Sequence, residues 1–351
     1  MLKKEYSRIV EAVVRKAQAL CPYSLELIGV YGSCATGDTH ERSDLDLLIL
    51  IRDEAGRCLS HAFILEDTGI GFDLYCTTWD MLERDAACTH PHLGKLMDSH
   101  ILYVGNPEAP ARLKALRQHA AEILSSDKRF EGAIATWERA KGAFAECCLA
   151  SSLPEARLHA AGVIQYLIEA LMLGSGHYFR KGVKRTFEEL SEAGIPFDLQ
   201  ATVTDVIACD TVEGLREGLT SLMRTVRRYL TACRTVSEPK SPPAAANLAG
   251  TYEEMVSNWK GKMAEAAKRG DVYASFMNTA SLAAMLEEIG AEVDIHRQVV
   301  MAGFDPRDLA ANAAQFDAIL AQYREEYRRA GISPQCYADT DAFLASYLGD
   351  I

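Results

Sequence analysis

The spacing of apolar residues changes several times over the first 105 positions, which predicts alternating helices and strands. Over residues 4–20 apolar side chains recur at helical spacing, from Tyr6 through Val13 to Leu20, so one face of a helix is apolar. Continuous apolar runs then predict strands over residues 24–31, 44–52, 59–66, 70–77 and 100–104, with a short helix from Trp79. This order predicts a small mixed sheet with helices packed on it.

Beyond residue 106 the apolar pattern is almost entirely helical. It predicts helices over residues 109–124, 129–149, 154–174, 184–193, 199–210, 213–234, 251–269, 272–289, 306–330 and 340–348. Three prolines among small and polar residues at 237–249 are typical of a linker. We therefore expect an α+β fold in which a mixed-sheet domain precedes an all-α helical-bundle region. The expected parts are a sheet domain (1–106), a helical domain (107–236), the Pro-rich linker (237–249) and a C-terminal helical domain (250–351). The two helical parts pack as one unit or as two, and the sequence leaves both open.

The most informative chemistry lies between the first two predicted strands. The first strand runs into Gly32-Ser33, and after ten intervening residues the second opens with Asp44-x-Asp46. Because side chains alternate along a strand, both aspartates point to one face, with alpha carbons about 6.6 Å apart. Leu45 points to the other face, into the core. Two carboxylates beside a turn with free backbone N–H groups are suited to hold Mg²⁺ and a triphosphate together.

This arrangement resembles the signature of the polymerase-beta-like nucleotidyltransferases, in which Gly-Ser precedes Asp-x-Asp by about ten residues. The similarity covers about the first 105 residues. Beyond them it becomes a general one, to antibiotic (aminoglycoside-type) nucleotidyltransferases that add a helical domain. The resemblance implies a third carboxylate on a nearby strand, for which Asp73 is the candidate. Asp44, Asp46 and Asp73 would then be catalytic and would bind Mg²⁺, with two ions expected.

The same resemblance implies a nucleotide-binding turn. Gly32 leaves room for phosphates, and Ser33 offers its hydroxyl and N–H to them. Arg42 and Ser43, just before the first aspartate, are candidates to contact the triphosphate or the acceptor. Arg42 is equally well explained as a solvated loop charge.

The predicted helix 154–174 suggests where the acceptor binds. It is apolar nearly all round and so is expected to be buried, with Gln165 and Glu169 one turn apart. In the nucleotidyltransferases that the chain resembles, a carboxylate serves as general base for the acceptor hydroxyl. Glu169 is the candidate, with a pKa raised by burial. The alternatives are a structural ion pair with Arg180, Lys181 or Arg185, or Asp73 acting as the base. The basic segment 176–185 is equally suited to contact the triphosphate.

Composition restricts the class of protein. The 351 residues carry a formal net charge of −12, which disfavours a nucleic-acid partner and suits a cationic acceptor. No apolar run approaches the length of about 18 residues needed to cross a bilayer, so no membrane association is expected and we expect a cytoplasmic protein. The ten cysteines include no Cys-x-x-Cys pair and are expected to be reduced. His90 and His92 are interpreted as loop residues.

These features predict a Mg²⁺-dependent nucleotidyltransferase that moves AMP from ATP to a hydroxyl of a small molecule and releases pyrophosphate. The resemblance implies an aminoglycoside-type acceptor and a role in antibiotic resistance. One alternative is a protein-modifying, AMPylating regulator or antitoxin of the same fold. A third is a nucleotide-binding scaffold without activity. The oligomeric state is not predicted.

Overall fold

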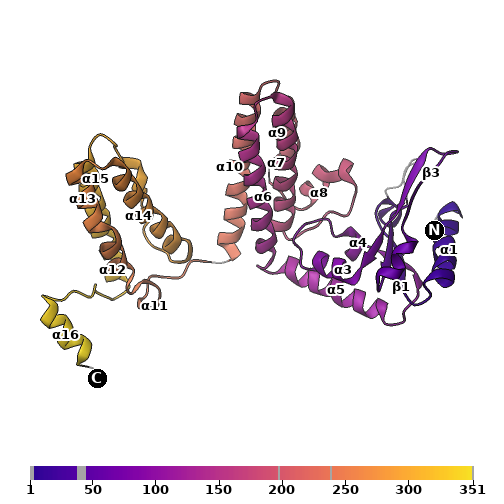
Figure 1. Ribbon diagram of the computed structural model, residues 1–351, viewed down its shortest axis with the longest axis horizontal. Coiled ribbons are helices and arrows are strands. Elements are labelled where there is room, and N and C mark those ends of the chain that lie inside the picture. The colour runs from indigo at the N-terminus through magenta and orange to yellow at the C-terminus, as the bar shows by residue number, and fades with distance from the viewer. Residues whose placement is uncertain (1–3, 38–44, 197, 238, 350–351) are drawn as a thin grey trace. The chain divides into compact units, whose positions relative to one another are not determined.

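The computed structural model describes residues 4–37, 45–196, 198–237 and 239–349. Its contacts divide the chain into two compact units, Met1–Glu238 and Pro239–Ile351, and each is described here by itself (Figure 1). The first unit holds a mixed sheet followed by helices, and the second is almost entirely helical. The α+β class predicted from the sequence is confirmed. The predicted domain boundaries stay a prediction.

A four-stranded mixed sheet organises the N-terminal part of the first unit. Its strands are β1 (Leu25–Val30), β2 (Leu47–Ile51), β5 (Cys76–Thr78) and β6 (His100–Val104), in the order β5-β2-β1-β6. β1 is antiparallel to β2 and to β6, whereas β5 is parallel to β2. Because β1 and β2 are antiparallel, they run in opposite directions, and the C-terminal end of β1 lies beside the N-terminal end of β2.

Helices cover both faces of this sheet, which explains why β2 is apolar at every position. Leu47, Ile49 and Ile51 pack with α1 (Lys4–Leu20), and Leu45 joins them as predicted. Leu48 and Leu50 point the other way, toward the face covered by α3 (Trp79–Ala86), α4 (Gly94–Met97) and α5 (Ala109–Ser125). Fully burying one such side chain contributes about 1.5–3 kcal/mol, so the central strands hold the site rigidly.

The strand predicted over 70–77 is two strands in two different sheets. β4 (Ile70–Leu74) pairs with β3 (His61–Leu65) in a separate antiparallel hairpin, and β5 begins after Tyr75. Side chains alternate along β4: Phe72 and Leu74 are buried in the cluster around α1, whereas Gly71 and Asp73 lie on the exposed face.

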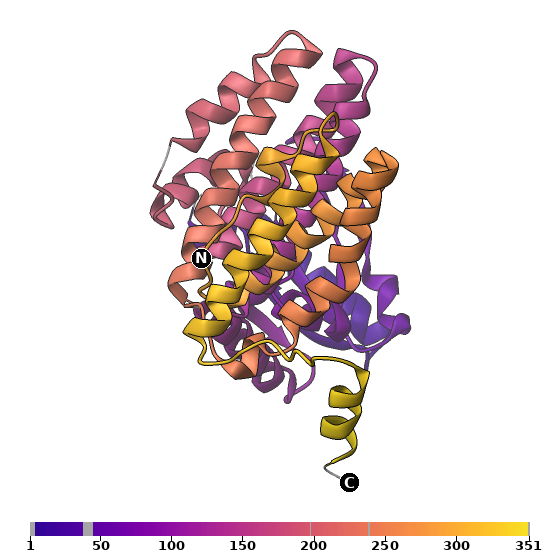
Figure 2. The same ribbon diagram turned by 90° about the vertical axis from the view of Figure 1, so that its left-hand side faces the viewer.

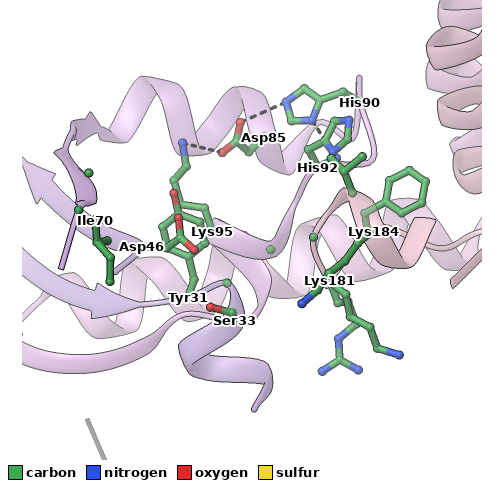
Figure 3. Close-up of a pocket in the computed structure, with 18 residues that line it drawn as sticks. Tyr31, Ser33, Asp46, Ile70, Asp85, His90, His92, Lys95, Lys181 and Lys184 are labelled. Atoms are coloured by element: carbon green, nitrogen blue, oxygen red, sulfur yellow. Dashed lines mark hydrogen bonds and ion pairs between the residues drawn. The ribbon is translucent and has the colours of Figure 1, made fainter. Parts of the chain in front are cut away.

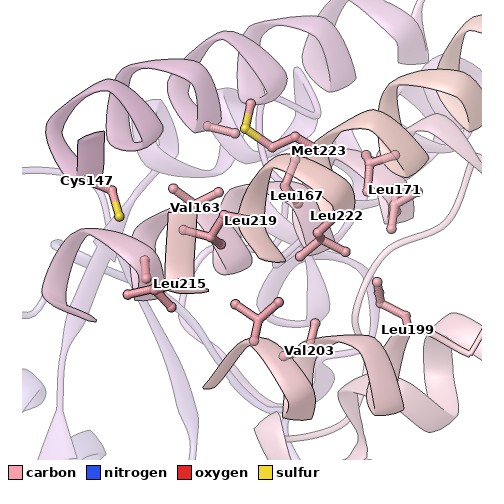
Figure 4. Packing of buried hydrophobic residues seen from close by; sticks show 14 of the residues in the cluster. Cys147, Val163, Leu167, Leu171, Leu199, Val203, Leu215, Leu219, Leu222 and Met223 are labelled. Atoms are coloured by element: carbon pink, nitrogen blue, oxygen red, sulfur yellow. The ribbon is translucent and has the colours of Figure 1, made fainter. Parts of the chain in front are cut away.

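The rest of the first unit is a helical bundle. Its long helices are α6 (Arg129–Leu149), α7 (Leu153–Gly174) and α10 (Val212–Ser237), and the shorter ones are α8 (Thr186–Glu192) and α9 (Leu199–Ile207). Leu167, Leu171, Leu219 and Leu222 interlock in their common core (Figure 4). α7 was predicted to be buried all round, but Ile164 and Ile168 are only half-buried, because that side of the helix lines a cavity.

The second unit has its own core. Helices α13 (Gly261–Arg269), α14 (Val272–Glu292) and α15 (Leu309–Arg329) pack around Phe316 and Tyr323. They are preceded by α11 (Ala245–Leu248), α12 (Thr251–Met255) and the π-helical segment Val256–Lys260. The last helix, α16 (Thr340–Leu348), stands apart from these helices in both views (Figures 1 and 2).

From Pro239 on, the Pro-rich segment predicted as a linker packs with the second unit. Ser241 forms backbone hydrogen bonds with Glu292 and Asp294, and Leu248 is fully buried. In the described parts of the chain, no helix is both long enough and apolar enough to cross a membrane.

Candidate functional site

The predicted Gly-Ser turn and the second aspartate meet where β1 ends and β2 begins. Val30 pairs with Leu47 in the antiparallel ladder. One step further, the Tyr31 N–H donates to the Asp46 carbonyl over 3.1 Å. β2 is shorter than predicted, so Asp46 lies just before it, on the same side as Leu48 and Leu50.

Gly32 is required by the backbone and by space. Its φ of 62° lies in the left-handed region that favours glycine, and a Cβ at this position would collide with the Asp46 carboxylate. Ser33 then begins the short helix α2 (Ser33–Thr36), whose N–H groups at Ala35 and Thr36 bond back to the Gly32 carbonyl. The turn therefore presents its backbone directly beside the carboxylate.

Gly32, Ser33 and Asp46 line one side of a cavity of about 950 Å³, here called the Asp46 cavity. Gly69, Ile70 and Gly71 of the β3–β4 hairpin close it on that side. The segment from Asp85 to Lys95 and the loop Phe179–Lys184 complete the wall. Figure 3 shows Lys181 and Lys184 across the cavity from Asp46.

Asp85 anchors the upper wall. The nearly buried carboxylate of this α3 residue contacts His90 Nε2 at 3.3 Å and Lys95 Nζ at 3.5 Å (Figure 3). Burial raises the pKa of Asp85, but the hydrogen bond from His90 and the charge of Lys95 outweigh it and hold the pKa below its usual value. Asp85 therefore stays ionised and keeps Lys95 at the cavity.

A buried glutamate shapes the basic loop opposite Asp46. The Glu189 carboxylate of α8 accepts hydrogen bonds from the backbone N–H groups of Arg180 (2.8 Å) and Lys181 (3.1 Å). Arg180 also contacts Asp98 at 3.3 Å. Arg180, Lys181 and Lys184 all line the cavity, so a cationic wall faces the Gly32-Ser33 turn. The sequence leaves two interpretations of this basic segment: an ion pair with Glu169, or contact with a triphosphate.

Glu169 is buried and fully engaged, but its partners differ from those considered in the sequence. Its carboxylate contacts His92 Nε2 at 3.0 Å, Arg139 Nη2 at 3.1 Å and Gln165 Nε2 at 2.9 Å. Burial raises the pKa of Glu169, yet the hydrogen bonds from His92 and Gln165 and the charge of Arg139 lower it below its usual value. The expected upward shift is therefore wrong, whereas a catalytic role for Glu169 stays a prediction.

His92 lies between the two parts of the first unit. Its ring stacks on Phe179 with centroids 5.5 Å apart, and the Phe179 N–H donates to the Pro91 carbonyl over 2.8 Å. His92 lines the Asp46 cavity and also a second one of about 690 Å³ that contains Glu169, here called the Glu169 cavity. Sequence reasoning treated His92 as a loop residue. The local pattern Thr-His-Pro-His does not indicate a contact with Glu169, which lies 77 residues further along the chain.

The remaining predicted residues are only partly placed. Arg42, Ser43 and Asp44 lie outside the described residues. Asp73 is exposed on β4, on the same face as the cavity-lining Gly71, but is not itself among the lining residues. The sequence does not predict Asp85 and Lys95 as site residues, because a helical pattern does not indicate which polar side chains line a cavity.

The Mg²⁺ that the resemblance implies fits the donors that the structure describes. Asp46 supplies carboxylate oxygen, and Mg²⁺ is commonly held by one or two carboxylates together with substrate phosphates. The space beside this carboxylate is one that a Cβ on residue 32 would fill. Among the described residues, no group of three or more His, Cys, Asp or Glu is placed to hold a metal. A complete ligand set including Asp44 therefore stays a prediction.

Comparison with known proteins identifies the domain that carries this turn. No curated protein matches the chain. Residues 7–103 match the family model described as a nucleotidyltransferase domain. Domains of this kind transfer a nucleoside monophosphate from a nucleoside triphosphate and typically use a divalent metal ion. The matched range starts in α1, ends in β6 and includes Gly32 and Asp46. The chain therefore contains a nucleotidyltransferase domain over residues 7–103.

Proposed function

We propose that this protein is a Mg²⁺-dependent adenylyltransferase that moves AMP from ATP to a hydroxyl of a small molecule and releases pyrophosphate. The observation that carries the proposal is the Asp46 cavity, where the Gly32-Ser33 turn and the Asp46 carboxylate face a wall of lysine and arginine side chains. A metal-bound triphosphate needs both charges, because the metal site is acidic and the phosphates are anionic.

The donor half of the reaction uses Asp46, Gly32, Ser33 and the cationic wall. Asp46, with Asp44 and Asp73 as the other proposed ligands, would hold Mg²⁺, which supplies charge neutralisation on the triphosphate when bound. Gly32 admits the phosphates, and Ser33 offers donors to them. Lys184 and Lys181, whose Nζ also contacts Glu188 at 2.8 Å and Glu192 at 3.2 Å, line the wall that the beta and gamma phosphates of the leaving pyrophosphate would face.

The acceptor half uses His92 and Glu169. When His92 Nε2–H donates to the ionised Glu169, Nδ1 retains a lone pair that can take a proton. In the proposed step the acceptor oxygen attacks the alpha phosphorus, the bond from that phosphorus to the bridging oxygen breaks, and pyrophosphate leaves. The hydroxyl proton passes to His92 Nδ1. Glu169 acts as a positioning residue that fixes the ring and stabilises its protonated form.

The adjoining Glu169 cavity supports a small-molecule acceptor over a protein. At about 690 Å³ it falls within the range of ordinary ligand sites, and it shares His92, Phe179 and Val183 with the Asp46 cavity. An acceptor bound there would reach the nucleotide past His92.

The proposal is tested by pyrophosphate release with Mg²⁺ and each of the four nucleoside triphosphates. The acceptor panel contains aminoglycosides, lincosamides and less polar alcohols. ATP-dependent release that requires one acceptor class supports the proposal. Labelling of proteins in a lysate, without any small-molecule product, would instead favour a protein-modifying enzyme. No turnover of any triphosphate with any acceptor would contradict nucleotidyl transfer.

Two variants test the proposed acceptor half. His92→Asn should lower turnover by about 100-fold or more, the range for loss of a general base, with little change in ATP affinity. His119→Asn, at a histidine of α5 that lines neither cavity, is the control and should leave the rate unchanged. Equal rates for both variants would remove His92 from the mechanism.

A further inference from the structure

The Glu169 cavity has a composition that bears on the acceptor, because most of its wall is apolar. Ala160, Ala161, Ile164 and Ile168 of α7 form one side, and Ile207 and Leu215, at the end of α9 and in α10, form another. Phe179 and Val183 close the side toward the Asp46 cavity. Only the region around His92, Gln165 and Glu169, together with Arg157 and Thr186, is polar.

The negative charge of this wall is already compensated. Glu169 is the only carboxylate among the described lining residues, and it is engaged by Arg139, His92 and Gln165. The other charged lining residue, Arg157, donates to the Cys209 carbonyl over 3.1 Å. A polycation entering the cavity would therefore lose its hydration without gaining an uncommitted carboxylate among these residues.

Most of the polar groups of the wall lie apart from its aliphatic groups. His92 stands at the boundary with the Asp46 cavity and contacts Glu169, whereas Ile207 and Leu215 belong to the wall contributed by the helical bundle alone. Arg157 is the exception, because it donates to the Cys209 carbonyl near Ile207. A bound molecule would thus meet His92 and Glu169 at the end that faces the nucleotide and mostly aliphatic side chains along its remainder.

From this separation we propose that the acceptor is an amphipathic alcohol, with one hydroxyl at His92 and an apolar ring or chain seated against Ile164 and Ile168. This inference rests on the proposed function and specifies its substrate class. It replaces the cationic, aminoglycoside-type acceptor, because that expectation rested on the resemblance and on the net charge of the whole chain and not on this wall. Each buried methylene of such an acceptor contributes about 0.8 kcal/mol to binding.

A binding experiment without nucleotide tests the cavity independently of catalysis. The fluorescent probe 8-anilinonaphthalene-1-sulfonate is added to the full-length protein and displaced with either 4-phenylbutan-1-ol or kanamycin. The probe should bind, the phenylalkanol should displace it, and kanamycin should not. Lengthening the alkyl chain by two methylenes should strengthen displacement by about tenfold, as about 1.6 kcal/mol of burial requires.

Matched variants on α7 locate the binding. Ala161 is an exposed residue of α7 that lines the cavity. Ala161→Trp should therefore fill the cavity and abolish the fluorescence of the bound probe that the phenylalkanol displaces. Leu158→Asp lies on the same helix, is 73% exposed and is not part of the wall, so it should leave binding unchanged. Ile164→Asp is a second test that introduces a charge without filling the space, and its melting temperature shows whether it remains folded.

The outcomes separate this inference from the proposed function. Displacement by the phenylalkanol that Ala161→Trp abolishes, and that Asp46→Asn preserves, supports the cavity assignment even if no transfer is seen. Displacement by kanamycin but not by the phenylalkanol overturns the inference while leaving nucleotidyl transfer intact. Binding that Ala161→Trp does not change also overturns it. A phenylalkanol carrying AMP as a product, formed by wild type but not by Ala161→Trp, would support both.

Discussion

At the scale of single residues, the Asp46 carboxylate leaves no room for a side chain at Gly32. Replacing Gly32 with alanine places a methyl group against the carboxylate that is expected to bind metal. Displacements of about 1 Å at a reacting centre can cost about 100-fold in rate, so Gly32→Ala should lose activity by this order. Pyrophosphate release, with the melting temperature measured in parallel, checks it.

Gly37→Ala is the matched control for this prediction. Gly37 also has a positive φ, of 78°, but a Cβ there would meet nothing within 4 Å. Both variants carry the backbone strain of a left-handed alanine, and only Gly32→Ala disturbs Asp46. Equal losses in the two variants would mean that strain in the turn, and not the carboxylate, limits the rate.

Glu169 gives a pH-dependent prediction. Its pKa in the folded protein is lowered, so its ionised form stabilises the fold above the unfolded-state pKa, and this stabilisation is lost as the pH falls through the lower, folded-state value. Glu169→Gln should therefore lower the free energy of unfolding at pH 7 by about 1.5–3 kcal/mol, the range for hydrogen bonds to charged groups.

Urea unfolding at several pH values measures that difference. The gap between wild type and Glu169→Gln should narrow as the pH falls below the normal carboxyl range. A gap that is constant down to pH 3 would show that the charge of Glu169 contributes nothing to stability.

At the scale of elements, the loop between α7 and α8 depends on one buried carboxylate. Glu189 accepts from the N–H groups of Arg180 and Lys181 and so sets the direction of the cationic wall. Glu189→Gln replaces one acceptor oxygen with an amide group that cannot accept, so the loop should loosen and the KM for ATP should rise by about tenfold, as a loss near 1.4 kcal/mol requires.

The control is Glu192→Gln in the same helix. Glu192 is exposed, and its carboxylate contacts the Lys181 Nζ at 3.2 Å. Exposed ion pairs are worth about 0–1 kcal/mol, so its effect on KM should be clearly smaller. If both variants behave alike, side-chain charge and not loop conformation controls ATP binding.

The same elements explain what the sequence predicts well. Apolar periodicity locates α1 and α6, because burial on one face leaves a repeating pattern, and the apolar run of β6 locates that strand although most of its side chains are exposed. Gly32 and Asp46 are found because the motif joins residues that the β1–β2 ladder brings together. His92 and Lys95 are not found, because their role arises from loops packed together over long sequence distances. The split of 70–77 into β4 and β5 is not predicted, because only Tyr75 separates the two strands and no turn-forming residue marks the break.

At the scale of the whole molecule, the structure assigns both cavities to the first unit. Their lining residues all lie before residue 238, and this unit has hydrophobic clusters of its own. A chain ending at residue 238 should therefore fold and retain the rate of the full chain per molecule. Circular dichroism and pyrophosphate release check this. A folded but inactive product would mean that Pro239–Ile351 contributes to the reaction.

The most direct test of the central claim follows the alpha phosphate itself. ATP labelled at this position is incubated with Mg²⁺, the acceptor panel and either wild type, Asp46→Asn or the control Asp80→Asn, at an exposed position of α3. Wild type and Asp80→Asn should transfer the label to the acceptor, and Asp46→Asn should be slower by about 100- to 1000-fold while keeping its fold. Transfer at the wild-type rate by Asp46→Asn, or no transfer by wild type to any acceptor, would contradict the account.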